Sequence, residues 1–242
     1  MIALREIYNC RKEEIDNFIE VIKFLECKEQ EKDDDGSEFD KFFHCQNGIN
    51  LSYQSLINIL KSNVSLMMYN LIEFTVANLM ECIYDKIKSN NLSYSDVNNL
   101  IKKLWTKTIL KATNDPNASF NTFVKKNEEI ITKIINNAVI ELKARDTLPA
   151  GNLDGITIRE TFENHGIAVN TSSSNYRPDI LNSIKEKRNN LAHGTVSFVE
   201  ALRDDSILDI EDNEKFISNF LEEVISLVAH YLSTESYKVE SE

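Results

Sequence analysis

Residues 64–88 read VSLMMYNLIEFTVANLMECIYDKIK, and apolar side chains recur in this stretch on nearly every side of a helix. A helix that is apolar all round is stable in the middle of a bundle, where other helices cover its faces. Ser62 and Asn63 precede the stretch and are favourable N-cap residues. The sequence therefore predicts an all-α fold, a helical bundle built around one long buried central helix.

Glu73 interrupts the apolar centre of this stretch. A carboxylate that is withdrawn from water is costly unless a cation or a hydrogen-bond donor compensates it. We therefore expect Glu73 to pair with an arginine of the core or with a helix terminus.

Helical spacing of apolar residues predicts further helices on both sides of the central one. Their approximate bounds are 4–25 and 51–60 before it, and 95–111, 124–143, 155–162, 178–194 and 213–232 after it. The charge-dense residues 28–40 are predicted to form an exposed acidic connector, because they have little apolar area to bury. Residues 115–117, Asp-Pro-Asn, mark a turn. The length suits one large domain or a tight pair of subdomains, and we take residues 1–242 as a single helical domain.

Asp154 and Gly166 delimit one short helix, as its N-cap and its stop. His165 then falls in the C-terminal turn. A helix dipole favours a charged imidazole at that end, so we expect His165 to be a dipole-stabilised residue rather than a catalytic one.

Length and composition indicate an ordinary globular protein, with 242 residues of which 42% are hydrophobic and 27% charged. The N-terminal residues lack the apolar core of a secretory signal. The most apolar stretch, 64–80, contains Asn70 and Glu73 and is shorter than the roughly 20 apolar residues of a membrane span. The expected location is the cytoplasm, without a membrane partner.

Four cysteines, Cys10, Cys27, Cys45 and Cys82, lie in the first third of the chain without a Cys-x-x-Cys pair. This spacing matches neither a disulfide framework nor a zinc motif. His44 beside Cys45 supplies only two adjacent ligands, and a structural zinc site needs four. We expect four reduced thiols, no metal and no other cofactor.

The net charge of −12 argues against broad, non-specific binding to nucleic-acid duplexes. Affinity for nucleic acid grows with the number of phosphates that lysines and arginines neutralise, and an acidic surface repels phosphates. Any nucleic acid must therefore be held locally, in a small basic cleft.

One predicted helix, 178–194, carries a group of residues suited to chemistry. Pro178 opens it and Gly194 ends it, and the buried stripe consists of Ile180, Leu181, Ile184 and Leu191. Asn189 and His193 are four residues apart and lie side by side elsewhere on the helix. Arg188 lies at the edge of the stripe, from which its guanidinium can reach the same cleft as His193.

The end of this helix, KRNNLAHG at 187–194, resembles the signature of the HEPN superfamily, in which an Arg, a polar residue and a His close such a helix. Four other segments resemble, in order, the MAE-type HEPN family of bacterial proteins. They are LREIYNCRKEEIDNFIEVIKFLE at 4–26, MMYNLIEFTVANL at 67–79, GNLDGITIRETFENHGI at 151–167 and FISNFLEEVISLVAHYL at 216–232. The resemblance implies an all-α fold, dimerisation through the motif helices, and ribonuclease activity typical of toxins and anti-phage defence proteins.

Cleavage of RNA without a metal requires a base, an acid and a cation that stabilises the phosphorane. A histidine can act as either base or acid near neutral pH, which suits His193 to either proton-transfer role, and Arg188 suits the phosphate oxygens. A homodimer supplies two histidines to one cleft beside its two-fold axis. Asn189 is expected to orient the phosphate or the His tautomer, and Lys185 and Lys187 to bind RNA.

Two points leave the function open. Nucleotidyltransferase-controlled HEPN toxins usually have a Tyr two residues after the His, and this chain has Thr195 there, so modification of that Tyr cannot regulate it. The superfamily also contains inactive members. The alternative to a ribonuclease is therefore a binding module of a defence or toxin-antitoxin complex, and in either case the expected partner protein is an antitoxin or another defence component.

Overall fold

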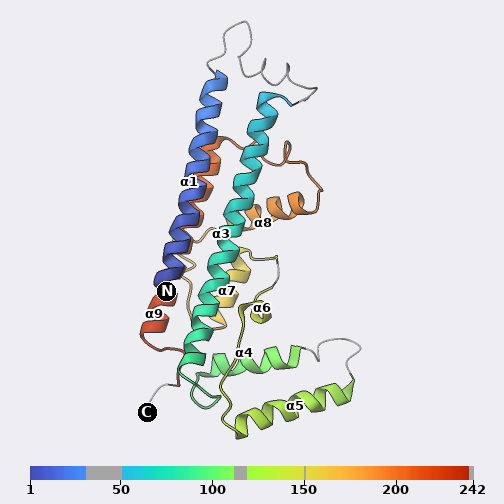
Figure 1. Ribbon diagram of the computed structural model, residues 1–242, viewed down its shortest axis with the longest axis vertical. Helices are drawn as coiled ribbons and strands as arrows, with labels where there is room; N and C mark the ends of the chain where they lie inside the picture. Colours follow the sequence, from blue (N-terminus) through green and yellow to red (C-terminus); the bar gives the residue numbers. More distant parts are fainter. Residues whose placement is uncertain (31–50, 112–118, 150, 240–242) are drawn as a thin grey trace. The chain divides into compact units, whose positions relative to one another are not determined.

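The computed structural model describes residues 1–30, 51–111, 119–149 and 151–239, and these residues form helices and no strand (Figure 1). The helices are α1 (Ile2–Gln30), α3 (Tyr53–Ser89), α4 (Asn99–Leu110), α5 (Phe120–Ile135), α6 (Ala144–Thr147), α7 (Gly155–Glu163), α8 (Pro178–Ala192) and α9 (Ile207–Ser233). The predicted all-α fold is confirmed. Residues 31–40 of the predicted acidic connector, the turn at 115–117 and the pair His44 and Cys45 lie outside the described residues.

The chain divides into two compact units. One contains residues 2–73 and 177–220 and is called the motif unit, because α8 belongs to it; the other contains residues 74–176 and 221–242, with Met1, and is called the α4–α7 unit. The boundaries at 73/74 and 220/221 fall inside the long helices α3 and α9, and the boundary at 176/177 directly precedes α8. No helix of the described residues is both long enough and apolar enough to span a membrane.

Helix α3 is the predicted long helix, and most of its apolar side chains are buried, while the others are half-buried. The prediction that a separate helix ends near residue 60 is wrong, because α3 runs without a break from Tyr53 to Ser89. Ser62 and Asn63 lie inside it and cap nothing. The Ser62 hydroxyl donates to the Phe198 carbonyl at 2.7 Å, and the Asn63 amide donates to the Ile59 carbonyl at 2.8 Å, so both polar groups are satisfied within a continuous helix.

Side chains of distant segments hold the motif unit together. The buried Tyr8 hydroxyl donates to the Ser218 carbonyl at 3.2 Å. Lys61, which is 5% exposed, pairs with Glu26 at 2.5 Å and donates to the Asp205 carbonyl at 3.1 Å. A buried ammonium is costly without such partners. These contacts join α1 to α9 and join α3 both to α1 and to the loop that follows α8.

Three capped helices organise the α4–α7 unit. Asn98 caps α4, Ser119 caps α5 and, as predicted, Asp154 caps α7 by accepting from the Thr157 amide at 2.8 Å. Helix α5 starts at Phe120 and ends at Ile135, eight residues before its predicted end at Lys143. Residue Asn137 has φ +48° and breaks the helix, after which Val139 forms an isolated bridge with Ser93.

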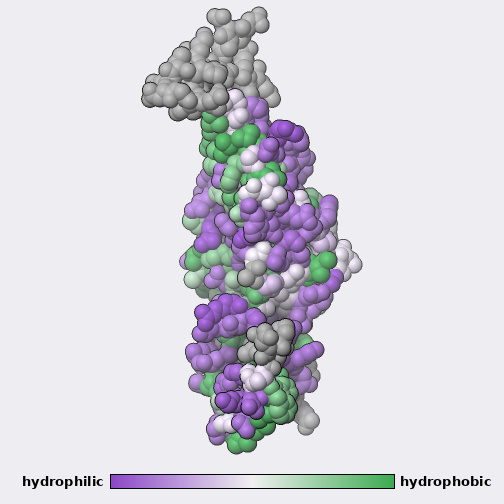
Figure 2. Space-filling view, turned by 90° about the vertical axis from the view of Figure 1, so that its right-hand side faces the viewer, coloured by the Kyte–Doolittle hydropathy of each residue, from purple (hydrophilic) through white to green (hydrophobic). Residues whose placement is uncertain are grey.

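Helix α5 leaves a large apolar surface uncovered. Its exposed apolar side chains are Phe120, Phe123, Val124, Ile131 and Ile135. Figure 2 shows hydrophobic surface at the lower end of the view, where α5 lies. Only Ile130 of this helix is buried.

His165 is buried, contrary to the expectation of a charged, dipole-stabilised residue. Its Nδ1 lies 2.7 Å from the Thr161 carbonyl oxygen and its Nε2 lies 2.7 Å from the Tyr84 hydroxyl. Burial lowers the pKa of His165 below its ordinary value, because an imidazolium loses its hydration there. The residue is thus a neutral part of the core. The predicted stop at Gly166, with φ +86°, is confirmed.

Helix α9 begins at Ile207, six residues before its predicted start. The start is set by a reciprocal cap, in which Ser206 Oγ accepts from the Asp209 amide at 3.2 Å and Asp209 Oδ2 accepts from the Ser206 amide at 3.0 Å. Helix α1 also extends beyond its predicted end, to Gln30, so the first residues assigned to the acidic connector are helical.

Candidate functional site

Helix α8 begins at Pro178 as predicted and ends at Ala192, two residues before the predicted end at Gly194, with His193 as its C-cap. Leu181, Ile184 and Leu191 are buried, and Ile180 is half-buried at the edge of the same stripe. Gly194 has φ +67°, a conformation that L side chains rarely adopt, and it lets the Thr195 amide donate to the Asn190 carbonyl at 2.9 Å. The helix end that presents His193 is therefore fixed by backbone geometry.

Arg188 is held from three sides inside the motif unit. Its NH2 nitrogen lies 3.8 Å from Glu73 Oε2, and its NH1 nitrogen donates to Asn189 Oδ1 at 2.9 Å. The guanidinium carbon lies 4.8 Å from the centroid of the buried Tyr69 ring, a cation-π contact. Glu73 thus has the arginine partner predicted for it, and the guanidinium is oriented without being fully buried.

His193 is exposed at the end of α8. No described residue makes a hydrogen bond or an ion pair with its imidazole, while its amide continues the helix by donating to the Asn189 carbonyl at 2.9 Å. Asn189, one turn earlier, is half-buried and receives the Arg188 hydrogen bond. Arg188 and Asn189 are therefore in contact in the last turns of α8, and His193 follows as the exposed C-cap of the same helix.

The two lysines predicted to bind RNA have different surroundings. Lys187 Nζ lies 2.6 Å from Asp205 Oδ1, and the two side chains are 22% and 24% exposed. This ion pair neutralises most of the charge that Lys187 was expected to add to the cleft. Lys185 is half-buried on the same helix.

Sequence reasoning did not identify Tyr69 or Asp205 as parts of this site. Tyr69 lies four residues before Glu73, the spacing that places two side chains on one helix face. That spacing was the available signal for Tyr69. No pattern of the sequence connects Asp205 to Lys187, which it meets only through the loop between α8 and α9.

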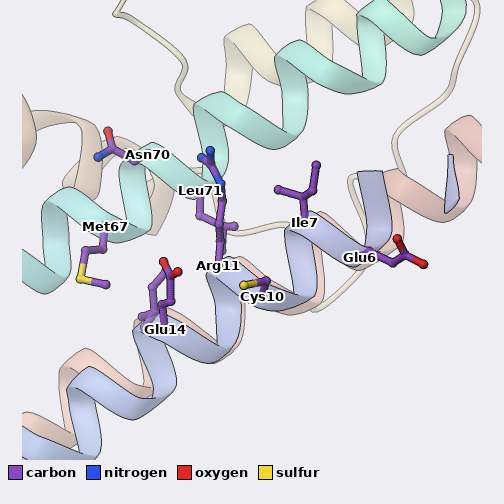
Figure 3. A pocket seen from close by; sticks show the side chains of 9 residues that line it. Glu6, Ile7, Cys10, Arg11, Glu14, Met67, Asn70 and Leu71 are labelled. Atoms are coloured by element: carbon purple, nitrogen blue, oxygen red, sulfur yellow. The ribbon is translucent and has the colours of Figure 1, made fainter. Parts of the chain in front are cut away.

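A groove between α1 and α3 lies in the same unit and has a volume of about 580 Å³ (Figure 3). Figure 3 shows Arg11 reaching from α1 toward α3, close to Leu71. Glu6 and Glu14 also line the groove. Its carboxylates disfavour a phosphate backbone, so the groove does not have the character of an RNA cleft.

The end of α8 presents an exposed imidazole, that of His193, and an oriented guanidinium, that of Arg188, which are groups suited to proton transfer and to phosphate binding. Among residues 1–30, 51–111, 119–149 and 151–239, no three His, Cys, Asp or Glu side chains are grouped so that they could hold a metal ion. The described cysteines Cys10, Cys27 and Cys82 are free thiols.

Residues 3–237 match the family model for HEPN_MAE_28990-like HEPN proteins. The match covers α8, both units and nearly the whole chain, and it confirms the family resemblance of the sequence. No curated protein and no solved structure matches the chain.

Proposed function

We propose that this chain, which belongs to the HEPN_MAE_28990-like HEPN family, is a metal-independent endoribonuclease that works as a homodimer. One observation carries the proposal. An exposed imidazole, that of His193, stands at the end of the helix that also presents the oriented guanidinium of Arg188. A base or acid and a phosphate-binding cation are the groups that RNA cleavage without a metal needs.

In the proposed reaction the ribose 2′-oxygen attacks the adjacent phosphorus while one imidazole removes its proton. The bond from phosphorus to the 5′-oxygen breaks, and an imidazolium protonates that leaving oxygen. Arg188 stabilises the extra charge on the non-bridging oxygens of the phosphorane. The products are a 2′,3′-cyclic phosphate and a 5′-hydroxyl.

The homodimer supplies the two proton-transfer groups. The described residues at the end of α8 include a single histidine, His193, and one imidazole is poorly placed to accept one proton and deliver another in the same step. A two-fold axis beside α8 would bring a second His193 and a second Arg188 to the same phosphate. RNA is the proposed substrate, and an antitoxin or another defence component is the proposed restraining partner.

The direct test is incubation of the purified protein with RNA in EDTA. Wild-type protein should produce fragments that end in 2′,3′-cyclic phosphate, and His193→Ala should produce none. His230→Ala is a matched control, because His230 is also an exposed helical histidine but lies on α9. Loss of cleavage in both variants, or cleavage that requires added magnesium, would contradict the mechanism.

A second function is favoured by the surroundings of Arg188. Its guanidinium already has partners in Glu73, Asn189 and Tyr69, as expected of a residue whose role is to hold the fold. The chain would then be an inactive binding module of a defence or toxin-antitoxin complex. In that case the wild-type protein gives no cleavage in the EDTA assay, with or without added magnesium; the melting temperature of Arg188→Ala falls under either function and does not separate them.

A further inference from the structure

Helix α5 presents its apolar side chains to solvent rather than to the core of its unit. Phe120 is 77% exposed, Ile135 is 73% exposed and Ile131 is 55% exposed. Phe123 and Val124 are also exposed, and the Phe120 ring stacks on the Phe123 ring with centroids 6.4 Å apart. These residues, Phe120, Phe123, Val124, Ile131 and Ile135, are called the α5 face. A contiguous apolar surface of this kind indicates a site of association.

The area of the α5 face is sufficient for a weak interface between proteins. If a fully exposed phenylalanine presents about 200 Å², the exposed fractions of its members give the face roughly 500 Å² of apolar surface. Two such faces would bury about 1,000 Å² together, the lower limit for a specific interface. We therefore expect an association that depends on protein concentration.

The spacing of the face points to what covers it. Phe120, Val124, Ile131 and Ile135 follow one another at intervals of four, seven and four residues. These intervals are close to one and two helical turns, so the side chains lie on one side of α5. The pattern is the same in both directions along the helix. A second α5 that runs antiparallel to the first therefore places its Ile135 against Phe120 and its Ile131 against Val124, and the reverse contacts follow by symmetry.

The centre of this pattern is occupied by a polar residue, Asn127. Its side-chain amide donates to the Phe123 carbonyl at 2.8 Å, within the same helix. This hydrogen bond lowers the cost of removing water from the centre of the α5 face, because the donated hydrogen keeps its partner.

The charges of α5 also suit a second copy. Lys126 and Lys133 both pair with Glu129, at 2.7 and 2.8 Å. The side chains of Lys125 and Glu128 are exposed, and neither makes an ion pair with any described residue. Helical geometry places Lys125 and Glu128 along the same edge of the α5 face, where one cation and one carboxylate are left for a partner.

An antiparallel pair brings these charges together. Its two-fold axis passes between Asn127 and Glu128, and the same edge of each helix then faces its counterpart. Lys125 of one copy lies about two residues, or about 3 Å, along the helix axis from the level of the second copy's Glu128, a distance that a lysine side chain spans. In a parallel pair opposite edges would meet, so Lys125 and Glu128, which share an edge, would not face each other.

We propose that the α5 face binds the α5 face of a second copy of this chain, antiparallel, with Lys125 of each copy paired with Glu128 of the other. The face belongs to the α4–α7 unit, whereas α8 belongs to the motif unit. The contact is therefore a second self-association surface, separate from the dimer of the proposed function and independent of ribonuclease activity. A chain with two different two-fold surfaces assembles beyond the dimer.

The first test measures the weight-average mass of the full chain by sedimentation over a range of concentrations. The test variant is Ile131→Glu. Its matched control is Ile156→Glu, because Ile156 is 54% exposed and lies on α7 of the same unit. At the highest concentration, wild type and the control should have about twice the mass of the test variant, and a dimer through α8 contributes equally to all three. The emission of Trp105, the chain's single tryptophan, which is buried in α4, verifies that the variants keep the fold of this unit.

The second test exchanges the charges. Lys125→Glu and Glu128→Lys should each lower the mass, because each substitution places like charges opposite each other in both copies of the pair. A one-to-one mixture of the two variants should recover the association, since every contact of a mixed pair again joins a lysine to a glutamate. Loss of folding cannot produce this recovery.

Equal masses of wild type and Ile131→Glu at every concentration would overturn the proposal, as would a mixture of the charge variants that associates no more than either variant alone. It would also fail if wild type, but not Ile131→Glu, bound vesicles of anionic phospholipid without any difference in mass, because the face would then meet a membrane surface. Ile131→Glu should cleave RNA in EDTA like wild type. A protein that cleaves RNA but shows equal masses loses only this proposal, and one that associates through α5 without cleaving RNA loses only the proposed function.

Discussion

The guanidinium of Arg188 lies 3.8 Å from the carboxylate of Glu73, and the pair joins α8 to α3 inside the motif unit. The side chains are 26% and 30% exposed, so water screens the attraction and the pair contributes little to stability. The main effect of the pair is to orient the guanidinium, which also contacts the Tyr69 ring and donates to Asn189. Glu73 also competes with any phosphate that approaches Arg188.

The first prediction concerns this competition. Glu73→Gln keeps the shape of the side chain and removes its charge, while Tyr69 and Asn189 still orient Arg188. We expect the KM for RNA to fall about three- to tenfold. A carboxylate about 4 Å from the guanidinium weakens the binding of a phosphate there by on the order of 1 kcal/mol in a well-solvated site, and the variant removes this penalty. Cleavage rates measured over a range of RNA concentrations check this. An unchanged or higher KM would mean that Glu73 is needed to hold Arg188.

Gly194 gives a second prediction. Its φ of +67° is unfavourable for a residue with a side chain, although a Cβ there would meet nothing within 4 Å. Gly194→Ala should therefore lower the free energy of unfolding by about 1 kcal/mol, from conformation alone. Asn tolerates positive φ better, so Gly194→Asn should cost less. Chemical denaturation of the three proteins measures the order, and equal losses for Ala and Asn would contradict the explanation.

The bounds of α8 were predictable because chemistry local to the sequence sets them. Pro178 cannot continue a helix from the preceding residue, and Gly194 supplies the positive φ that ends one. The end of α5 was not predictable in this way. It depends on positive φ at Asn137, for which Asn is permitted but not diagnostic, and on a pairing of Val139 with distant Ser93.

The same distinction applies to the candidate site. Spacing on one helix was enough to group Arg188, Asn189 and His193, because all three lie on α8. The partners Tyr69 and Asp205 come from other segments, and only the packing of the motif unit brings them to α8. For that reason the sequence-based prediction that Lys187 adds positive charge to the cleft did not include its ion pair with Asp205, which neutralises this charge.

The third prediction is a dependence of stability on pH through His165. Burial lowers the pKa of His165 in the folded state, whereas in the unfolded chain it has its ordinary value of about 6.5. The unfolded state therefore binds the proton more readily than the folded state. The contribution of neutral His165 to the free energy of unfolding is thus complete above about pH 6.5 and is lost as the pH falls below that value. Chemical denaturation should show that the free energy of unfolding decreases less from pH 7 to pH 5 for His165→Gln than for wild type. Parallel decreases would show that His165 does not titrate in this way.

The fourth prediction compares the two motif side chains. His193 is exposed and its side chain makes no hydrogen bond or ion pair with the described residues, so His193→Ala should leave stability within about 0.5 kcal/mol of wild type. Arg188→Ala also removes the contacts with Tyr69 and Glu73 and should cost about 1 to 2 kcal/mol. Each variant should lower the RNA cleavage rate by about 10²-fold or more. Arg203→Ala, which alters an exposed arginine outside α8, is the matched control for both stability and cleavage.

The last prediction tests whether one cleft uses histidines from two protomers. In a mixture of wild-type protein with a threefold excess of His193→Ala, incubated until subunits exchange, random pairing places about a quarter of wild-type protomers in wild-type dimers. If both imidazoles of a dimer are needed, cleavage per wild-type protomer should fall to about a quarter of its value in a mixture with His230→Ala, in which every dimer keeps two copies of His193. A monomeric enzyme, or a dimer whose sites work independently, would lose nothing on mixing. Exchange itself is verified with differently labelled protomers, because a mixture that has not exchanged would look the same as independent sites.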